Sequence, residues 1–422
     1  MKRIGAFVCA AALLLGLTAC GGEPSSEQTP ERGSLSGLEP VAALSDAGKA
    51  GYSSFALRLM QETAEEGENN LLSPASAYLA LAMTANGADG NTRRQMLDVL
   101  GAADLGALNT DCRDLQSVLV GNPNGYFRLA NSLWINQKAA SSIRPAFLEA
   151  NREYFGAAAR LEDFGAGIVE KINRWVSDNT AGRIDALLDA LGQDNFMVLV
   201  NTLLFEGTWA ETFQPEATSG GTFHAAGGDK TLPMMHQTRS NAVWYEDGTV
   251  QATRLPFDDG RTALLLALPK GELHEWLASL TPETLGKLAA GQGACPRLDL
   301  TLPRFQVSFR QDLRDVLAAM GMPEAFARGQ ADFSGMVKPE RKEERHYIDQ
   351  VMHETVLEVS EKGATAAAAT AVVMDGLGMP PDVEIRELTL DRPFFCALVD
   401  EKTGAVLFGG AVYDPEELKL EG

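Results

Sequence analysis

Hydrophobic and polar positions along the chain predict a folded part that opens with helices. Residues 74–86 are apolar on nearly every side, which predicts a buried helix with Ser73 as its N-cap. The next helix is expected to start at Asn91 or Thr92 and to end at Gly101, since glycine often follows the last helical turn. Two consecutive helices are thus expected early in the folded part.

The rest of the chain mixes helical and strand periodicities. Helices are predicted near residues 146–156, 168–190, 274–290 and 311–321. Runs rich in Val, Leu, Phe or Thr predict strands at 127–135, 196–205, 250–257, 261–269, 298–309, 350–360 and 393–413. Because strands and helices do not alternate regularly, the pattern favours an α+β fold over a doubly wound parallel sheet.

Residues 1–19 are typical of a signal peptide. Lys2 and Arg3 precede an apolar run that is shorter than the roughly 20 residues of a membrane-spanning helix. The sequence Leu17-Thr18-Ala19-Cys20 looks like a bacterial lipobox, which predicts cleavage before Cys20 and lipidation of this cysteine. The alternative is a plain signal peptide cut near Ala19. Two or more acyl chains would hold the exported protein on the outer side of a bacterial cell membrane.

Residues 20–42 are predicted to be the lipidated cysteine and a flexible tether. Gly, Ser, Pro and Glu dominate residues 21–40, where large apolar residues are nearly absent, as is typical of flexible linkers. One folded domain is expected over residues 43–416, followed by an acidic tail at 417–422. We expect a monomer that contacts the membrane through its lipid alone.

Composition narrows the classes of partner and cofactor. Lys and Arg number 36 against 57 Asp and Glu, and the net charge of −21 opposes the phosphates of a nucleic acid, which is therefore not expected as a partner. The five cysteines are too few and too scattered for a disulfide scaffold or a zinc site: Cys9, Cys20, Cys112, Cys295 and Cys396. We expect no metal, no cofactor and, after lipidation of Cys20, three free thiols.

Catalytic motifs are incomplete in this sequence. Ser177-Asp178-Asn179 and Lys402-Thr403-Gly404 match signatures of penicillin-recognising serine enzymes, but no Ser-x-x-Lys supplies the nucleophile. His353-Glu354 lacks the second histidine of a zinc protease. The histidines are dispersed along the chain, and none is proposed as a catalyst. We do not expect an enzyme.

Residues 361–381, EKGATAAAATAVVMDGLGMPP, have an unusual composition. They carry no charge over 363–374 and little bulk before Val372. Their alanines favour a helix, whereas their small and β-branched side chains would also suit a strand that enters a packed sheet. The glycines and prolines that follow predict an exposed loop, in which Leu377 is the large apolar side chain offered to a protease.

Many short motifs, in order, resemble the serpin family over residues 43–415. They are 69–76 (NNLLSPAS), 87–92 (GADGNT), 199–202 (LVNT), 205–209 (FEGTW), 302–305 (LPRF), 331–336 (ADFSGM), 353–363 (HETVLEVSEKG), 391–395 (DRPFF) and 407–410 (LFGG). Each motif is weak alone, whereas the ordered set is specific. The resemblance implies helices packed around three β-sheets and a suicide-substrate inhibitor of proteases.

The resemblance also implies an exposed reactive loop over about residues 361–381. Counting from Glu361 places the cleaved bond at Leu377-Gly378, with Met374 or Met379 preceding the cleaved bond if the register slips. After cleavage, residues 363–374 are expected to insert into the large sheet and to drag the acyl-linked protease with them. The start of the loop is the hinge, which comprises Glu361, Gly363, Ala364, Thr365, Ala366, Ala367 and Ala368.

Further residues acquire roles from the same resemblance. Four of them correspond to the shutter, a polar cluster under the sheet that opens during insertion: Ser73, Ser76, Asn201 and His353. Trp209 corresponds to the breach, where the inserting strand enters. The alternative is that these side chains are only hydrogen-bonded core groups.

A leucine before the cleaved bond indicates a chymotrypsin-like or elastase-like serine protease as the target, with a subtilisin-like protease or a papain-like cysteine protease as the alternatives. Two other functions stay open. One is a non-inhibitory serpin that binds a partner or is simply cleaved, and the other is an unrelated surface lipoprotein that binds solutes. The segment 363–369 (GATAAAA), which has neither proline nor charge, argues against the first, and the distance of the alanine-rich hinge from the Pro393 strand argues against the second.

Overall fold

The computed structural model describes residues 41, 43–121, 126–193, 195–338, 346–364 and 384–418. Several sequence-based predictions fall outside these described residues: the signal peptide, the lipidation site Cys20 and nearly all of the tether. The same holds for the reactive-loop residues Thr365, Ala366, Ala367, Ala368, Leu377 and Gly378.

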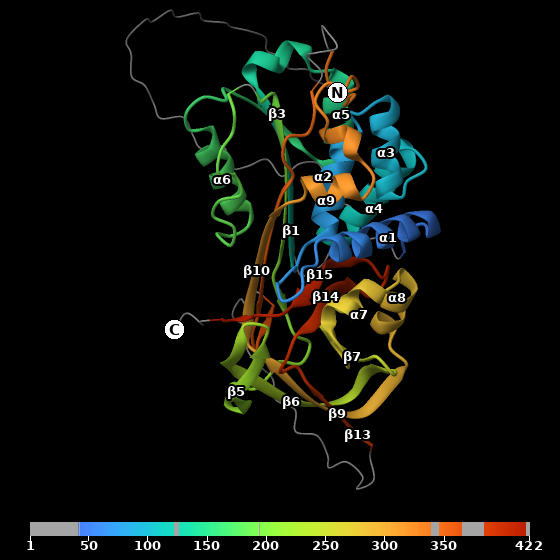
Figure 1. The fold of residues 1–422 in the computed structure, drawn as a ribbon, viewed down its shortest axis with the longest axis vertical. Coiled ribbons are helices and arrows are strands. Elements are labelled where there is room, and N and C mark those ends of the chain that lie inside the picture. The colour runs from blue at the N-terminus through green and yellow to red at the C-terminus, as the bar shows by residue number, and fades with distance from the viewer. Residues whose placement is uncertain are drawn as a thin grey trace, which may run out of the picture. The chain divides into compact units, whose positions relative to one another are not determined.

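The described strands form three sheets (Figure 1). The first has the order β2-β1-β3, with β1 (Phe127–Asn136), β2 (Ala158–Glu162) and β3 (Met197–Phe205). The second has the order β16-β10-β11-β12-β4, with β4 (Gly207–Thr208), β10 (Phe305–Asp312), β11 (Met352–Val359), β12 (Gly363–Ala364) and β16 (Glu416–Glu417). The third has the order β13-β9-β6-β7-β8-β14-β15, with β5 paired to β6: β5 (Thr218–Ala225), β6 (Gly228–Glu246), β7 (Val250–Pro256), β8 (Thr262–Pro269), β9 (Gly293–Pro303), β13 (Ile385–Thr389), β14 (Phe394–Asp400) and β15 (Val406–Val412).

Helices cover these sheets, as the predicted α+β serpin fold requires. They are α1 (Asp46–Glu62), α2 (Pro74–Ala85), α3 (Gly90–Leu100), α4 (Leu105–Val120), α5 (Pro145–Phe155), α6 (Ile168–Asn179), α7 (Leu273–Ser279), α8 (Pro282–Ala290) and α9 (Arg314–Ala319). Figure 1 shows α6 on one side of β1, β3 and β10, and α2 on the other. The inner strands are therefore covered on both faces.

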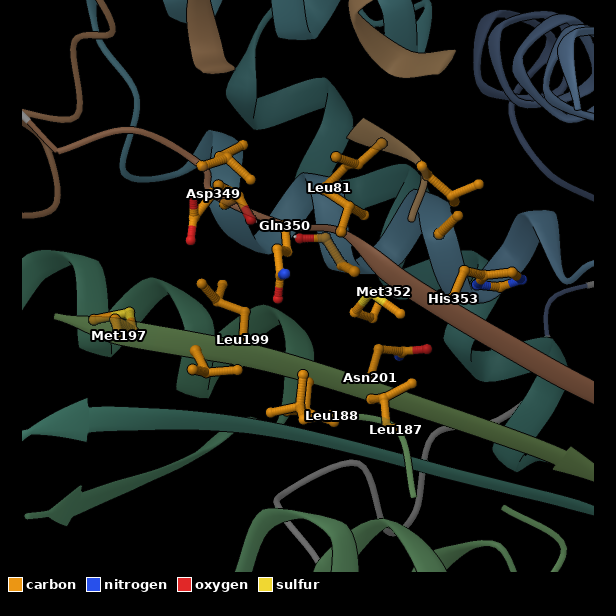
Figure 2. Close-up of a pocket in the computed structure, with 18 of the residues that line it drawn as sticks. Leu81, Leu187, Leu188, Met197, Leu199, Asn201, Asp349, Gln350, Met352 and His353 are labelled. Carbon is orange, nitrogen blue, oxygen red and sulfur yellow. Dashed lines mark hydrogen bonds between the residues drawn. The ribbon is translucent and has the colours of Figure 1, made fainter. Parts of the chain in front are cut away.

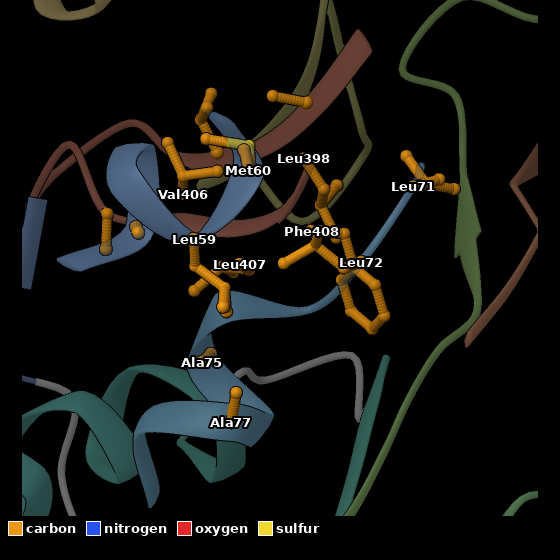
Figure 3. Packing of buried hydrophobic residues seen from close by; sticks show 14 of the residues in the cluster. Leu59, Met60, Leu71, Leu72, Ala75, Ala77, Leu398, Val406, Leu407 and Phe408 are labelled. Atoms are coloured by element: carbon orange, nitrogen blue, oxygen red, sulfur yellow. The ribbon is translucent and has the colours of Figure 1, made fainter. Parts of the chain in front are cut away.

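The buried helix predicted over 74–86 is confirmed as α2. The hydroxyl of Ser73 accepts the N–H of Ser76, which caps the helix, and nearly every residue of α2 is buried. Figure 3 shows Ala75 of this helix in the same apolar cluster as Leu59 of α1 and Leu407 of β15. An apolar surface on all sides is thus explained by a helix packed among several elements.

Two predicted helix boundaries are wrong. Asp89, and not Asn91 or Thr92, caps α3, because its carboxylate accepts the N–H of Gly90 at 2.8 Å. Helix α6 ends at Asn179 and does not continue to residue 190. Its extension is stopped by Ala181 and Gly182, whose φ angles of 51° and 74° lie in the left-handed region.

Three other predicted segments are each two elements. The helix predicted over 274–290 is divided into α7 and α8 by Thr281, which caps α8 ahead of a proline at its first position. The strand predicted over 298–309 is divided into β9 and β10 at Arg304. The run over 393–413 is the antiparallel pair β14 and β15.

The pattern analysis missed α1, α4 and the long strand β6. Two glycines interrupt α1, yet Gly51 is required there because a Cβ would overlap the carbonyl oxygen of Gly101. Strand β6 spans 19 positions without a regular alternation of polar and apolar residues, and it pairs in turn with β5, β9 and β7. Its length follows from partners that only the tertiary fold supplies.

The three cysteines of the described domain, Cys112, Cys295 and Cys396, are buried and unpaired, which confirms the predicted free thiols. Burial raises the pKa of the Cys396 thiol to about 12, so this group stays protonated and unreactive. Within the described ranges, none of the helices is long and apolar enough to cross a membrane.

Candidate functional site

The hinge begins in a tight turn after β11. The N–H of Ser360 donates to the carbonyl of Gly363 at 2.9 Å, and β12 follows at once. Ala364 lies opposite Val359 of β11 on one side and Gly207 of β4 on the other. The first hinge residues are therefore a strand in the middle of a sheet, with Ala364 completely buried.

Only glycine fits at the first position of β12. A Cβ built on Gly363 would overlap the carbonyl oxygen of Gly207, a backbone atom that cannot move aside as a side chain would. This close approach gives a packing reason for the glycine that the serpin resemblance placed in the hinge.

Glu361 anchors the turn through its side chain and its backbone. Its carboxylate pairs with Arg304 at 3.2 Å and accepts the hydroxyl of Thr218 at 2.8 Å. Its carbonyl accepts the N–H of Phe213 at 2.9 Å. The carboxylate is nearly fully buried and the guanidinium largely so, and removing one partner of such a pair leaves an uncompensated charge.

Trp209 fastens the other side of the turn. Its indole N–H donates to the carbonyl of Ser360 at 2.9 Å, and its backbone N–H donates to the carbonyl of Lys362 at 3.0 Å. The ring stacks on Phe257 with centroids 4.4 Å apart. The residue that the resemblance assigned to the breach thus holds the hinge where β12 enters the sheet.

Below β12 the strands β3 and β11 are not paired with each other. Strand β3 pairs with β1, and β11 pairs with β10 and, at its end, with β12. A cavity of about 550 Å³ lies between them and is lined by both strands, α2 and the segment after α6. Figure 2 shows Leu199 and Asn201 of β3 facing Met352 and His353 of β11 across it. This cavity is called the slot below.

The four predicted shutter residues meet at the slot. The Ser73 N–H donates to Nε2 of His353 at 3.0 Å, and the Ser73 hydroxyl donates to the carbonyl of Leu407 at 2.8 Å. The Ser76 hydroxyl donates to the side-chain oxygen of Asn201. All four residues line the slot. The structure places them together, and their role in opening the sheet stays a prediction.

Sequence reasoning missed two residues of this arrangement, Asn131 and Arg304. The Asn201 amide donates to Asn131 of the paired strand β1 at 2.6 Å, which orients Asn201 toward Ser76. Neither residue has a local signal, because each acts on a partner 57 or more positions away. Arg304 belongs to the motif 302–305 (LPRF), but the resemblance assigned no role to this residue.

The incomplete enzyme motifs have local structural roles. Ser177, Asp178 and Asn179 form the last turn of α6. Thr403 lies in the turn between β14 and β15, where its N–H donates to the Asp400 carboxylate at 2.7 Å. Among the described residues, no group of His, Cys, Asp and Glu is arranged to hold a metal ion.

His353 gives the shutter a dependence on pH. Burial lowers its pKa from 6.5 to about 4, because the protonated ring is poorly solvated there. The unfolded chain therefore binds a proton between these two values that the folded chain does not. The contribution of His353 to the stability of the fold should be constant above pH 6.5, fall as the pH decreases below that value, and have decreased by about 3 kcal/mol below pH 4.

We expect the urea midpoint of the native protein to fall between pH 7 and pH 5.5, and to fall less in His353→Asn. This pH range lies above the usual pKa values of carboxyl groups. Both proteins contain His346, whose pKa is shifted down, and His224, whose pKa is shifted up, so the difference between the two proteins reports on His353. An identical pH dependence in both proteins would contradict the assignment to His353.

Comparisons with known proteins agree with this geometry. The family model described as Serpin (serine protease inhibitor) matches residues 50–415. An uncharacterised serpin-like protein of Thermococcus kodakarensis is 32% identical over 371 residues, which cover 86% of this chain and 85% of that protein.

Solved structures show the same fold. The crystal structure of tengpin, a thermophilic serpin, in its native state matches with a TM-score of 0.79 and 26% identity, covering 90% of this chain and 99% of tengpin. Thyroxine-binding globulin in complex with thyroxine matches with a TM-score of 0.75 and 25% identity, covering 87% and 99% of the two chains. The chain therefore belongs to the serpin family, whose members are generally protease inhibitors without catalytic activity of their own.

Proposed function

We propose that this protein is a suicide-substrate inhibitor of chymotrypsin-like or elastase-like serine proteases, with Leu377-Gly378 as the bond attacked. The observation that carries the proposal is β12: the hinge already forms a strand between β11 and β4, and the slot continues its path between β11 and β3. A strand that has entered at one end can extend by adding residues, each supplying backbone hydrogen bonds.

The registers of β12 predict where each inserted residue goes. Ala364 lies opposite Val359 and Gly207, so six residues further along, Thr370 falls opposite His353 and Asn201. The two registers agree on this position independently. The polar side chain of Thr370 would thus meet the polar shutter cluster, which supports the insertion mechanism.

The chemistry follows from this geometry. The protease serine attacks the Leu377 carbonyl, the bond to Gly378 breaks, and the new amino terminus leaves with the C-terminal part of the chain. Insertion of the freed hinge then moves the ester-linked enzyme and distorts its active site. Loss of one oxyanion-hole donor costs about 3 kcal/mol of transition-state stabilisation, enough to slow deacylation by more than a hundredfold.

The proposal predicts a denaturant-resistant complex when the protein is mixed with chymotrypsin or elastase. The released C-terminal peptide should begin at Gly378, and its sequence together with electrophoresis of the complex is the measurement. Leu377→Glu is the matched control, because neither protease accepts a carboxylate in its S1 pocket, and it should form no complex. A peptide that begins at Asp375 or Pro380 would move the cleaved bond to Met374 or Met379.

Cleavage without any complex would favour the second candidate, a non-inhibitory serpin that binds a ligand or partner. The match to thyroxine-binding globulin supports this alternative, because that protein is seen with a small molecule bound. For either activity, we propose that a lipid on Cys20 holds the domain on the outer side of a bacterial membrane. The signal and lipobox sequence support this placement.

A further inference from the structure

The C-terminal segment Glu416–Leu418 forms the outer edge of the sheet that contains the hinge. Glu416 and Glu417 make up β16, which pairs antiparallel with Gln306 and Phe305 at the start of β10. The family match ends at residue 415, directly before this strand. β16 therefore lies outside the part of this chain that the family model matches.

Side chains hold this segment in place. Leu418 is only 8% exposed, although Glu416 and Glu417 are exposed. The Glu417 carboxylate lies 4.0 Å from the guanidinium of Arg304, the same side chain that pairs with Glu361 of the hinge. An ion pair this exposed contributes little by itself, so the buried leucine and the backbone pairing fix the segment.

The start of β10, which β16 covers, is also the part of this strand that is most prone to pair with another chain. Its first residues include the buried Phe305 and Val307 and carry no charge. Its later residues expose Ser308, Arg310 and Asp312, and charged side chains on an edge strand discourage pairing with another chain. An uncovered start of β10 would present unpaired backbone groups beside an apolar surface, which is a template for strand addition.

We propose that residues 416–418 act as a guard strand, which prevents the start of β10 from pairing with an extended strand of a second copy of this chain. The pairing with β16 shows that this edge accepts an antiparallel strand. The two glutamates also place negative charge at the edge, so two guarded edges repel each other. This role does not depend on protease inhibition.

The test compares two truncations of the otherwise complete protein by sedimentation velocity over a series of concentrations. Removal of residues 416–422 deletes the guard strand, and removal of 419–422 is the matched control that keeps it. We expect the first variant to approach the mass of a dimer or larger species as its concentration rises. The control should keep the mass of the full-length chain at every concentration.

Hydrogen exchange locates the contact. In dilute solution, amides of residues 305–307 should exchange faster in the guardless variant than in the control, and association should protect them again. Leu418→Asp, which keeps the backbone but cannot bury its carboxylate, should reproduce both effects in milder form. Equal masses for the two truncations, or association that leaves residues 305–307 unprotected, would overturn the proposal.

Discussion

Ala366→Glu is expected to convert the protein from an inhibitor into a substrate of the same protease. If insertion extends β12 in its observed register, this position, two residues beyond Ala364, is expected to fall opposite the buried Leu357 and to face the interior of the sheet. An unpaired carboxylate buried there costs several kcal/mol, which slows insertion while hydrolysis of the acyl-enzyme proceeds. The number of inhibitor molecules consumed per protease inactivated should rise by about tenfold or more, since each 1.4 kcal/mol is a factor of ten.

Ala367→Glu is the matched control for this prediction. In the same register the next residue along is expected to face the opposite side of the sheet, beside the partly exposed Val356, where a carboxylate has more access to water. Titration of a fixed amount of protease with each variant measures the ratio. If Ala366→Glu inhibits as efficiently as the parent protein, insertion in the register of β12 is not the mechanism.

Gly363→Ala should expel the hinge from the sheet before any protease acts. Its Cβ would overlap the Gly207 carbonyl oxygen, so β12 cannot form and the pairing on both sides of Ala364 is lost. Since insertion then lacks its first step, we expect inhibition to decrease by an order of magnitude or more at unchanged cleavage of the loop. Hydrogen exchange at residues 207–209 should increase at the same time.

Lys362→Ala is the matched control for Gly363→Ala, because it changes the neighbouring residue of the same turn. The Lys362 side chain is exposed, and within the described part of the chain the contact of Lys362 is the hydrogen bond that its carbonyl accepts from the N–H of Trp209. This variant should inhibit and exchange like the parent. Unaltered exchange at residues 207–209 in Gly363→Ala would show that the hinge is not held between β11 and β4 in solution.

The most accurate sequence-based predictions concern segments that have the same environment on all sides, such as a helix that is buried all round. Helix α2 could be predicted because a helix that is apolar on all sides with a Ser-Pro start fits only a buried place. Where the competing signals are equal, the prediction failed: Asp89, Asn91 and Thr92 are all good caps, and only the observed hydrogen bond to Gly90 distinguishes them.

The sequence by itself determined the family and the α+β class, because these depend on residue types in a fixed order. It predicted the hinge and the shutter residues as a set, and their roles stay predictions. Only the tertiary structure decided that Gly363 lies against Gly207, that Arg304 pairs with Glu361, and that β16 covers the edge of β10. The physical reason is the range of the interactions. Caps and periodicities act within a few residues, whereas these contacts join positions whose distance along the chain carries no information about their distance in space.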